Sequence, residues 1–262
     1  MINFAAITPH PPLLIPNIGK ENIEKLKTTK EAMEDLEKKL ITADIETLII
    51  ISSYHKAHHN TYGIVLNENY ITGFKEFADF ETKIKFLPDL EIIEKIRHAT
   101  IDNNIPLNLI HNEKLDYAYG VPLYYLCQNK NIKIVPFSHT YDGIKKHYEL
   151  GRYIKNILTE SNKKIGIIAS GNLSHRSNEL SPQGMLTAGK KFNDKFIELI
   201  ETKNTSGLLG LDEKKAETAE QSILLPTSLL MGIIDKINYK PQVFSFEAPL
   251  GIGYMVCNFK LL

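Results

Sequence analysis

The sequence alternates short runs rich in Ile, Val and Phe with longer stretches whose apolar residues recur at helical spacing. Buried parallel strands have near-continuous apolar runs, and crossover helices usually connect them. The alternation therefore predicts an α/β fold with a central mixed, largely parallel sheet flanked by helices. We expect strands at residues 2–8, 47–53, 62–66, 132–138, 164–170, 242–247 and 253–259. We expect helices at residues 20–40, 90–103, 117–128, 145–159, 185–202, 214–222 and 227–237.

The length and the even composition favour one domain. The chain has 262 residues, of which 43% are hydrophobic, and no Gly/Ser linker or low-complexity tract divides it. A chain of roughly 250 residues is within the range of a single α/β domain. We therefore expect residues 1–262 to form one domain. The charged stretch 21–39 has apolar residues at helical spacing, so we interpret it as the solvated face of a helix with no assigned function.

The charge balance argues against a nucleic-acid partner. Lys plus Arg and Asp plus Glu both total 31, so the formal net charge is zero. A protein that neutralises phosphates carries an excess of positive charge, often gathered in a patch. We expect no nucleic-acid ligand.

Cysteine usage and hydropathy predict a cytoplasmic protein. Cys127 and Cys257 are far apart and without CxxC spacing, so the sequence encodes neither a disulfide framework nor a thiolate zinc site. The N-terminus lacks a basic segment before an apolar run, and no stretch reaches the roughly 18 apolar residues that span a bilayer. We expect no membrane association.

Histidines gather at the ends of the expected strands. Four of the nine histidines, His10, His55, His139 and His175, stand at or just after the C-terminal end of an apolar run. Glu247 ends a later run in the same way. In open α/β sheets ligands bind at the carboxyl ends of the strands. Imidazoles and a carboxylate at this edge predict a metal site.

The residue types leave two metals open. Two histidines and one carboxylate on one face of the ion form the usual site of non-haem Fe(II) enzymes that bind substrate and dioxygen. Zn(II) with three protein ligands and a water would use the same residues. Fe(II) is the expected metal, and Zn(II) is the alternative.

The local sequence around each histidine refines these roles. His10 lies between prolines that fix φ and exclude helix, so we expect a stiff loop. His58 and His59 follow His55 closely, and only one of these three needs to be a ligand. Gly171 permits close backbone approach to a ligand, and we interpret residues 171–176 as a reactive loop. We expect three further histidines at the surface: His98, His111 and His147.

Five short motifs agree in order and spacing with one known family. They are PHPPLLIP from residue 9, SSYH from residue 52, LDY from residue 115, GNLSHR from residue 171 and FEAPLGIGY from residue 246. Together they resemble the catalytic-subunit family of class III extradiol ring-cleavage dioxygenases, in particular the bacterial branch associated with AMMECR and Memo proteins.

The resemblance implies a site and a reaction. By position, His10 and His55 match the histidine ligands of the metal, Glu247 matches the carboxylate ligand, and His175 matches the acid/base histidine. The implied enzyme is an Fe(II)-dependent oxidoreductase of aromatic compound metabolism that opens a catecholic or related small aromatic ring with dioxygen. An imidazole suits the proton transfers because its pKa is near neutrality.

Two departures from the family pattern concern the surroundings of the metal. Tyr117 stands where the family usually has a histidine, and a phenol donates a hydrogen bond but is a poor proton shuttle at neutral pH. We hypothesise that His139 supplies the missing imidazole from another strand. Asn172 stands where an aspartate is typical, so a carboxylate that orients the loop or raises the basicity of His175 is absent.

Other functions remain open at this point. A zinc-dependent hydrolase would use the same ligands to activate water. A non-catalytic, Memo-like binding protein would retain the pocket, and the altered positions 117 and 172 favour it somewhat. The resemblance also implies a homodimer and an AMMECR-type or radical-SAM partner protein.

Overall fold

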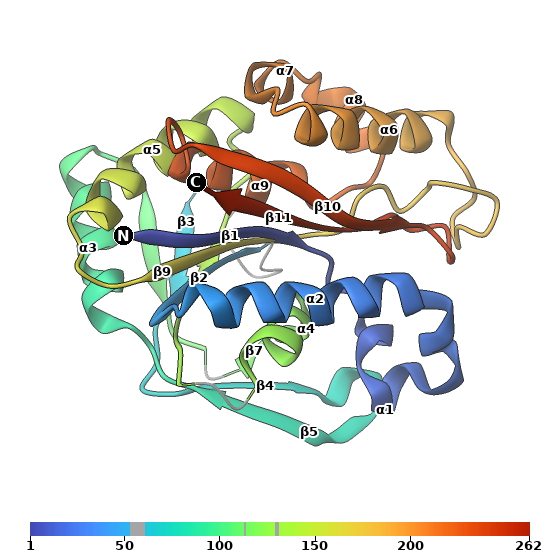
Figure 1. Ribbon diagram of the computed structural model, residues 1–262, viewed down its shortest axis with the longest axis horizontal. Helices are drawn as coiled ribbons and strands as arrows, with labels where there is room; N and C mark the ends of the chain where they lie inside the picture. The colour runs from blue at the N-terminus through green and yellow to red at the C-terminus, as the bar shows by residue number, and fades with distance from the viewer. Residues whose placement is uncertain (53–60, 113, 129–130) are drawn as a thin grey trace.

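The computed structural model describes residues 1–52, 61–112, 114–128 and 131–262, and most of its strands join one large sheet (Figure 1). The strands of this sheet are β1 (Ile2–Thr8), β2 (Thr47–Ser52), β3 (Tyr62–Val65), β6 (Leu107–Ile110), β8 (Lys133–Ser138), β9 (Ile165–Ser170), β10 (Tyr239–Glu247) and β11 (Tyr254–Leu261). Their order is β10-β11-β1-β9-β2-β8-β3-β6. The seven expected strands are all present in this sheet, with ends that differ by up to three residues.

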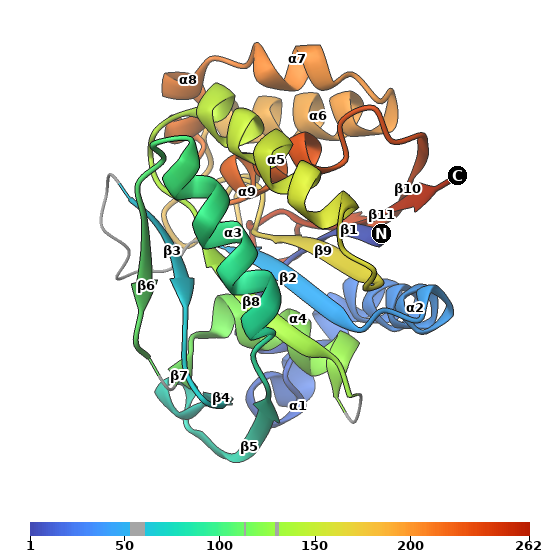
Figure 2. The ribbon, with the colours of Figure 1, turned by 90° about the vertical axis from the view of Figure 1, so that its left-hand side faces the viewer.

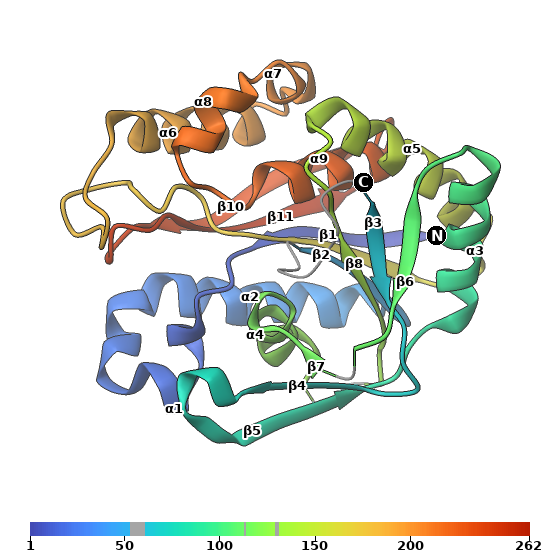
Figure 3. The same ribbon diagram turned by 180° about the vertical axis from the view of Figure 1, so that it is seen from behind.

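The helices cover both faces of the sheet, as the predicted fold class requires. They are α1 (Pro16–Gly19), α2 (Lys27–Ala43), α3 (Leu90–Asp102), α4 (Tyr117–Cys127), α5 (Ile144–Thr159), α6 (Thr187–Glu201), α7 (Thr205–Leu209), α8 (Glu213–Thr218) and α9 (Leu224–Ile233). One apolar core joins α3, α5, α6 and α9 to the sheet, and a second core joins α2 and α4 to the opposite face. Figure 2 shows α3 and α5 beside the strands, and Figure 3 shows α2 and α4 on the other side.

The centre of the sheet is parallel. Strands β1, β9, β2 and β8 are neighbours in this order, and each pair runs parallel. The antiparallel members lie outside this block, where β11 pairs with β1 and β3 pairs with β8. Because four parallel strands are adjacent, the loops that carry His10, His175 and His139 leave the same edge of the sheet. The mixed, largely parallel sheet is confirmed.

A row of hydroxyl side chains closes this parallel block. Thr8 and Ser170 are register partners at the ends of β1 and β9, and Ser52 and Ser138 are register partners at the ends of β2 and β8. All four are fully buried. Side chains that are paired in register share one face of a sheet, and the Ser170 hydroxyl contacts α4, so this hydroxyl row lies on the α2/α4 face.

A second, smaller sheet was not expected from the sequence. It contains β4 (Tyr70–Phe74), β5 (Asp79–Phe86) and β7 (Lys114–Leu115) in the order β5-β4-β7, and it lies beyond α4 (Figure 1). The aromatic stretch before α3 supplies most of it. Tyr70 and Phe74 are buried, whereas Phe80 is 66% exposed.

Further expectations concern the helix after β1, the cysteines and the membrane. The expected helix at 20–40 begins as a 3-10 turn, Lys20–Leu26, and becomes α-helical from Lys27. Cys127 and Cys257 are buried, and they are not joined in a disulfide. In the part of the chain that the structure describes, no helix combines the length and the apolar character needed to cross a membrane.

Candidate functional site at the carboxyl edge of the sheet

His10 is buried at the exit of β1, with 4% of its surface exposed. Its backbone N–H donates to Oδ1 of Asn172 at 3.1 Å, and its Nδ1 lies 3.0 Å from Oγ of Ser170. After the prolines that flank it, the chain turns into a short 3-10 helix, Pro12–Leu14, in which the restricted φ of proline is suited to the first turn. His10 is therefore held by one hydrogen bond from its backbone and by a second at its imidazole ring.

Tyr117 lies beside His10. The two rings meet edge to face with centroids 5.7 Å apart, and Phe77 meets the other side of Tyr117 at 5.3 Å. Asp116 caps α4 by accepting the N–H of Ala118 at 2.9 Å, so Tyr117 is fixed as the first residue of the helix. Burial raises the pKa of Tyr117, which keeps its hydroxyl protonated and able to donate.

His175 lies in the loop that follows the neighbouring strand β9. The backbone N–H of His175 donates to the carbonyl of Glu220 at 3.3 Å, and the Ser181 hydroxyl donates to the carbonyl of His175. The side-chain Nε2 is buried and has no hydrogen-bond partner among the described residues. Burial lowers the pKa of His175, and the nearby Glu220 carboxylate opposes this effect only in part. The lowered pKa favours the neutral form of the imidazole.

Asn172 connects the two histidine loops. Its side-chain oxygen accepts from the backbone of His10, while its own N–H donates to Oγ of Ser222 at 2.9 Å. The N–H of Ser222 donates back to the Asn172 carbonyl at 3.0 Å. An amide oxygen can accept a hydrogen bond as a carboxylate oxygen does, so Asn172 orients the His10 loop without a charge.

Glu247 lies at the same edge of the sheet, two strands from β1. Strand β10 runs parallel to β1 because β11 pairs antiparallel with both. The Glu247 oxygen Oε1 accepts from the backbone N–H of Thr29 at 2.7 Å and from its hydroxyl at 2.5 Å. Thr29 is the third residue of α2, where a carboxylate also interacts favourably with the helix dipole. Sequence reasoning assigned the segment around Thr29 no function, and its helical spacing gives no signal of this contact.

His139 follows β8 and points into a different environment. It is 6% exposed, and its Nδ1 lies 2.7 Å from the carbonyl of Thr140, so Nδ1 donates and Nε2 holds the lone pair. Burial lowers the pKa of His139 to about 4. Three strand spacings, roughly 14 Å, separate the ends of β1 and β8. His10 and His139 therefore stand at opposite ends of the parallel block.

His147 was expected at the surface, and this expectation is wrong. The side chain is fully buried on α5, with its ring centroid 5.7 Å from that of His139. Its Nδ1 lies 2.6 Å from the carbonyl of Gly143, and burial lowers its pKa to about 3. The charged neighbours in the sequence occupy the outer face of α5 and concealed this buried position. His98 and His111 are exposed, as expected.

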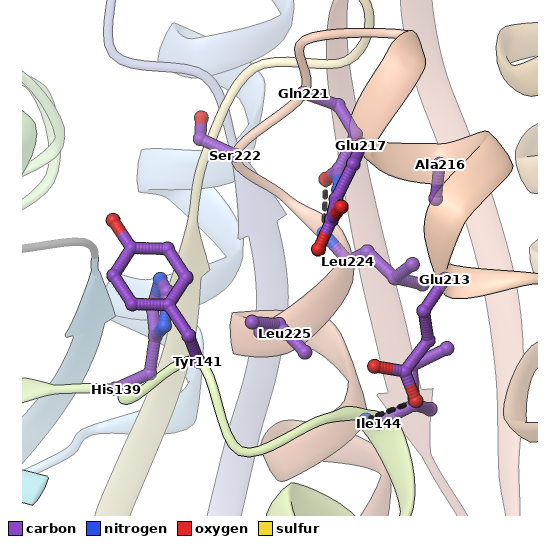
Figure 4. A pocket seen from close by; sticks show the side chains of 10 residues that line it. All are labelled: His139, Tyr141, Ile144, Glu213, Ala216, Glu217, Gln221, Ser222, Leu224 and Leu225. Carbon is purple, nitrogen blue, oxygen red and sulfur yellow. Dashed lines mark hydrogen bonds between the residues drawn. The ribbon is translucent and has the colours of Figure 1, made fainter. Parts of the chain in front are cut away.

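A cavity of about 270 Å³ opens beside His139 (Figure 4). Its polar wall includes Gln221, which accepts the N–H of Leu224 at 2.8 Å, and Glu213, which accepts the N–H of Ile144 at 3.1 Å. The lining residues are His139, Tyr141, Ile144, Glu213, Ala216, Glu217, Gln221, Ser222, Leu224 and Leu225. Ser222 is the residue that bonds Asn172, so one wall of the cavity is joined to the loop that holds His10.

The ligand set is only partly within the described residues. His55, His58 and His59 lie outside them. Among the residues that the structure describes, no group of three or more His, Cys, Asp or Glu side chains is arranged to hold a metal ion. The described candidates at the α2/α4 face are His10, with Tyr117 beside it, and Glu247.

A family model described as the catalytic LigB subunit of aromatic ring-opening dioxygenase matches residues 4–257. The chain belongs to the LigB family. This membership confirms the resemblance that the five sequence motifs indicate.

Two known proteins are similar to this LigB-family chain. Protein CA_C1420 of Clostridium acetobutylicum is 26% identical over 266 residues, which cover 97% of this chain and 57% of the relative, so the chain spans little more than half of that protein. The crystal structure of uncharacterized protein JW3007 from Escherichia coli K12 shares the fold, with a TM-score of 0.67, 16% identity and coverage of 98% of this chain and 99% of that chain.

Proposed function

We propose that the protein is a non-haem Fe(II)-dependent extradiol dioxygenase that opens a catecholic or related small aromatic ring. Membership of the LigB family supports a ring-opening dioxygenase. The observation that carries the proposal is the placement of buried His10 at the carboxyl edge, with the His175 loop on the neighbouring strand and Glu247 at the same edge. This is where an α/β sheet binds its ligands.

The described residues supply donors of the types that a divalent metal takes. Nδ1 of His10 contacts Ser170, so the imidazole would coordinate through Nε2. Glu247 is anchored through Oε1, which leaves Oε2 for a further partner. With His55, these residues would form the two-histidine, one-carboxylate set typical of non-haem Fe(II). When bound, Fe(II) supplies a centre that holds the substrate oxygens together with dioxygen and passes electrons between them.

The protein supplies the proton transfers. His175 is neutral at pH 7, so its Nε2 would accept the hydroxyl proton of a catechol and return it as the ring opens. Tyr117 keeps its proton and would donate a hydrogen bond to a substrate oxygen beside His10. We assign the acid/base role to His175 because its strand adjoins β1, whereas His139 lies three strands away.

The cavity beside His139 is our candidate for the approach of the aromatic ring. A volume of about 270 Å³ is large enough for a substituted single ring, and Ile144, Leu224 and Leu225 give it an apolar side. Leu225→Trp would fill the cavity and should raise KM for bulky catechols without removing bound metal.

The proposal is tested by metal content and dioxygen uptake. Protein purified without oxygen from iron-fed cells should hold near-stoichiometric iron and consume dioxygen with members of a catechol panel. His10→Ala should lose both, whereas His98→Gln, on the exposed face of α3, should keep both. Stoichiometric zinc with no dioxygen uptake would favour a hydrolase. If neither the wild type nor His98→Gln holds metal after reconstitution, the protein is a binding protein.

We also propose a cytoplasmic protein that acts as a homodimer with an AMMECR-type or radical-SAM partner. The greater length of Protein CA_C1420 leaves room for a second module and supports a partner acting with this domain. Size-exclusion chromatography coupled to light scattering tests the homodimer. Co-purification with the candidate partner tests the complex with the partner protein.

A further inference from the structure

Helix α4 carries a proline in its interior. Pro122 has no N–H, so the carbonyl four residues earlier, that of Ala118, receives no intrahelical hydrogen bond from it. A buried carbonyl without a donor is costly, and the structure provides one from outside the helix. The hydroxyl Oγ of Ser170, in the hydroxyl row, lies 2.6 Å from the Ala118 oxygen.

The Ser170 hydroxyl has two neighbours but a single hydrogen. A carbonyl oxygen only accepts, so at 2.6 Å the hydrogen must lie between Ser170 and Ala118. Ser170 then faces Nδ1 of His10, at 3.0 Å, with a lone pair. The ring nitrogen must be the donor in this contact. The direction of both hydrogen bonds therefore follows from the carbonyl of Ala118.

We propose that Ser170 is a positioning residue that fixes His10 as the tautomer protonated on Nδ1. The hydrogen bonds from His10 Nδ1 to Ser170 and from Ser170 to the Ala118 carbonyl, which Pro122 leaves without its helical donor, form a relay. The lone pair of His10 is then on Nε2. This inference rests on the proposed function in one respect only, namely that the lone pair on Nε2 binds a metal. The tautomer itself is a property of the metal-free protein.

The relay changes how readily His10 coordinates. An imidazole protonated on Nε2 presents a hydrogen to the metal and must exchange its proton between the nitrogens before it can bind. Histidine ligands commonly donate their second N–H to a fixed acceptor, and loss of that acceptor typically lowers metal affinity by roughly 10- to 100-fold. Ser170 fulfils this part from β9, 160 residues away in the sequence.

The decisive measurement is the tautomer of His10 without metal. Protein labelled with 15N histidine is studied by NMR at pH 7.5 after metal removal, and the His10 signals are identified from their absence in His10→Gln. We expect His10 protonated on Nδ1 in the wild type and a mixture of tautomers in Ser170→Ala. Ser138→Ala is the matched control, because Ser138 ends β8 in the same hydroxyl row but two intervening strands separate it from β1.

Metal affinity gives the second measurement. Titration with Co(II) or Zn(II) should show an affinity at least 10-fold lower in Ser170→Ala, recovery in Ser170→Thr, which keeps a hydroxyl, and no change in Ser138→Ala. A wild-type His10 protonated on Nε2, or an unchanged tautomer in folded Ser170→Ala, would overturn the proposal. If the tautomer shifts as expected but the wild type binds no metal, the relay stands and the proposed dioxygenase does not.

Discussion

The carboxylate of Glu247 accepts hydrogen bonds from both the backbone N–H and the hydroxyl of Thr29, at 2.7 and 2.5 Å. The two residues are 218 positions apart, so this contact joins the carboxyl edge of the sheet to the first turn of α2. The same side chain thus has a structural partner and, in the proposed function, a metal. These two roles make different demands and can be separated by substitution.

Glu247→Gln should separate the charge from the hydrogen bond. The amide oxygen can still accept from Thr29, so we expect the free energy of unfolding to fall by only about 1 kcal/mol as the interaction with the helix dipole is lost. Bound iron should fall by more than 10-fold, because a neutral amide is a weaker ligand than a carboxylate. Urea unfolding and metal analysis on the same preparation measure the two effects.

Thr29→Val is the complementary variant. Valine keeps the shape of threonine but removes the hydroxyl donor, so we expect a loss of about 1 kcal/mol in unfolding free energy with bound iron close to the wild-type value. Equal loss of iron in both variants would show that the anchoring of Glu247, rather than its charge, controls the metal.

Asn172→Ala should loosen the His10 loop. The substitution leaves the backbone N–H of His10 without its acceptor in a buried setting, and we expect a loss of about 1–2 kcal/mol in unfolding free energy. Asn172→Asp retains an oxygen at this position and should stay closer to the wild type. Calorimetry at pH 7 compares the three proteins. A larger loss for the aspartate than for the alanine would mean that this oxygen contributes nothing.

The buried pair His139 and His147 predicts acid sensitivity. Burial lowers their pKa values to about 4 and about 3, below the ordinary value of 6.5 that the unfolded chain restores. Between about pH 6.5 and pH 4 the unfolded state binds more protons, so stability is fully present above pH 6.5 and is lost as the pH falls. Each histidine should remove about 2 kcal/mol between pH 7 and pH 5.

Urea midpoints measured from pH 7 to pH 5 test this dependence. His139→Gln should reduce its slope by about half, because one of the two buried imidazoles no longer takes up a proton on unfolding. The exposed His98→Gln should leave the slope unchanged. A slope unaffected by His139→Gln would contradict the assignment of the acid sensitivity to this pair.

Helices α5 and α9 touch through glycines, which predicts a severe effect of one added methyl group. A Cβ on Gly232 would lie 2.1 Å from the carbonyl oxygen of Tyr148, and backbone atoms cannot give way cheaply. We expect Gly232→Ala to cost several kcal/mol or to prevent folding. Gly210→Ala, whose Cβ would meet nothing closer than 3.4 Å, is the control and should melt within a few degrees of the wild type.

Sequence patterns predicted seven of the eight strands that the structure describes in the large sheet, because those seven contain apolar runs. Strand β6 was not predicted, since none of its four residues is fully buried. Continuous apolar runs identified all four parallel strands, and His10, His139 and His175 follow three of them at one edge of the sheet. The small sheet escaped because β5 alternates exposed charged residues with few buried ones, and β7 has only two residues. Short strands with exposed faces do not produce an apolar run.

The sequence predicted that His10, His139 and His175 follow neighbouring strands, but it did not predict the contacts that support them. His10 and Tyr117 lie together, as the family resemblance implies, although their separation in the sequence alone gives no sign of it. Thr29 and Ser170 act through contacts with residues more than 150 positions away, and single hydroxyls in a helix or at a strand end carry no distinctive pattern. His147 was misplaced because periodicity marks a buried face only when the buried residues are apolar.

The position of β1 between β9 and β11 has a consequence for synthesis on the ribosome. One edge of β1 pairs with residues 165–170 and the other with residues 257–258, so His10 emerges long before either neighbour exists. The early chain therefore holds an unpaired apolar strand, and contacts of such long range also form slowly. Nascent chains stalled before residue 254 should depend on chaperones, and metal should load only after release of the chain.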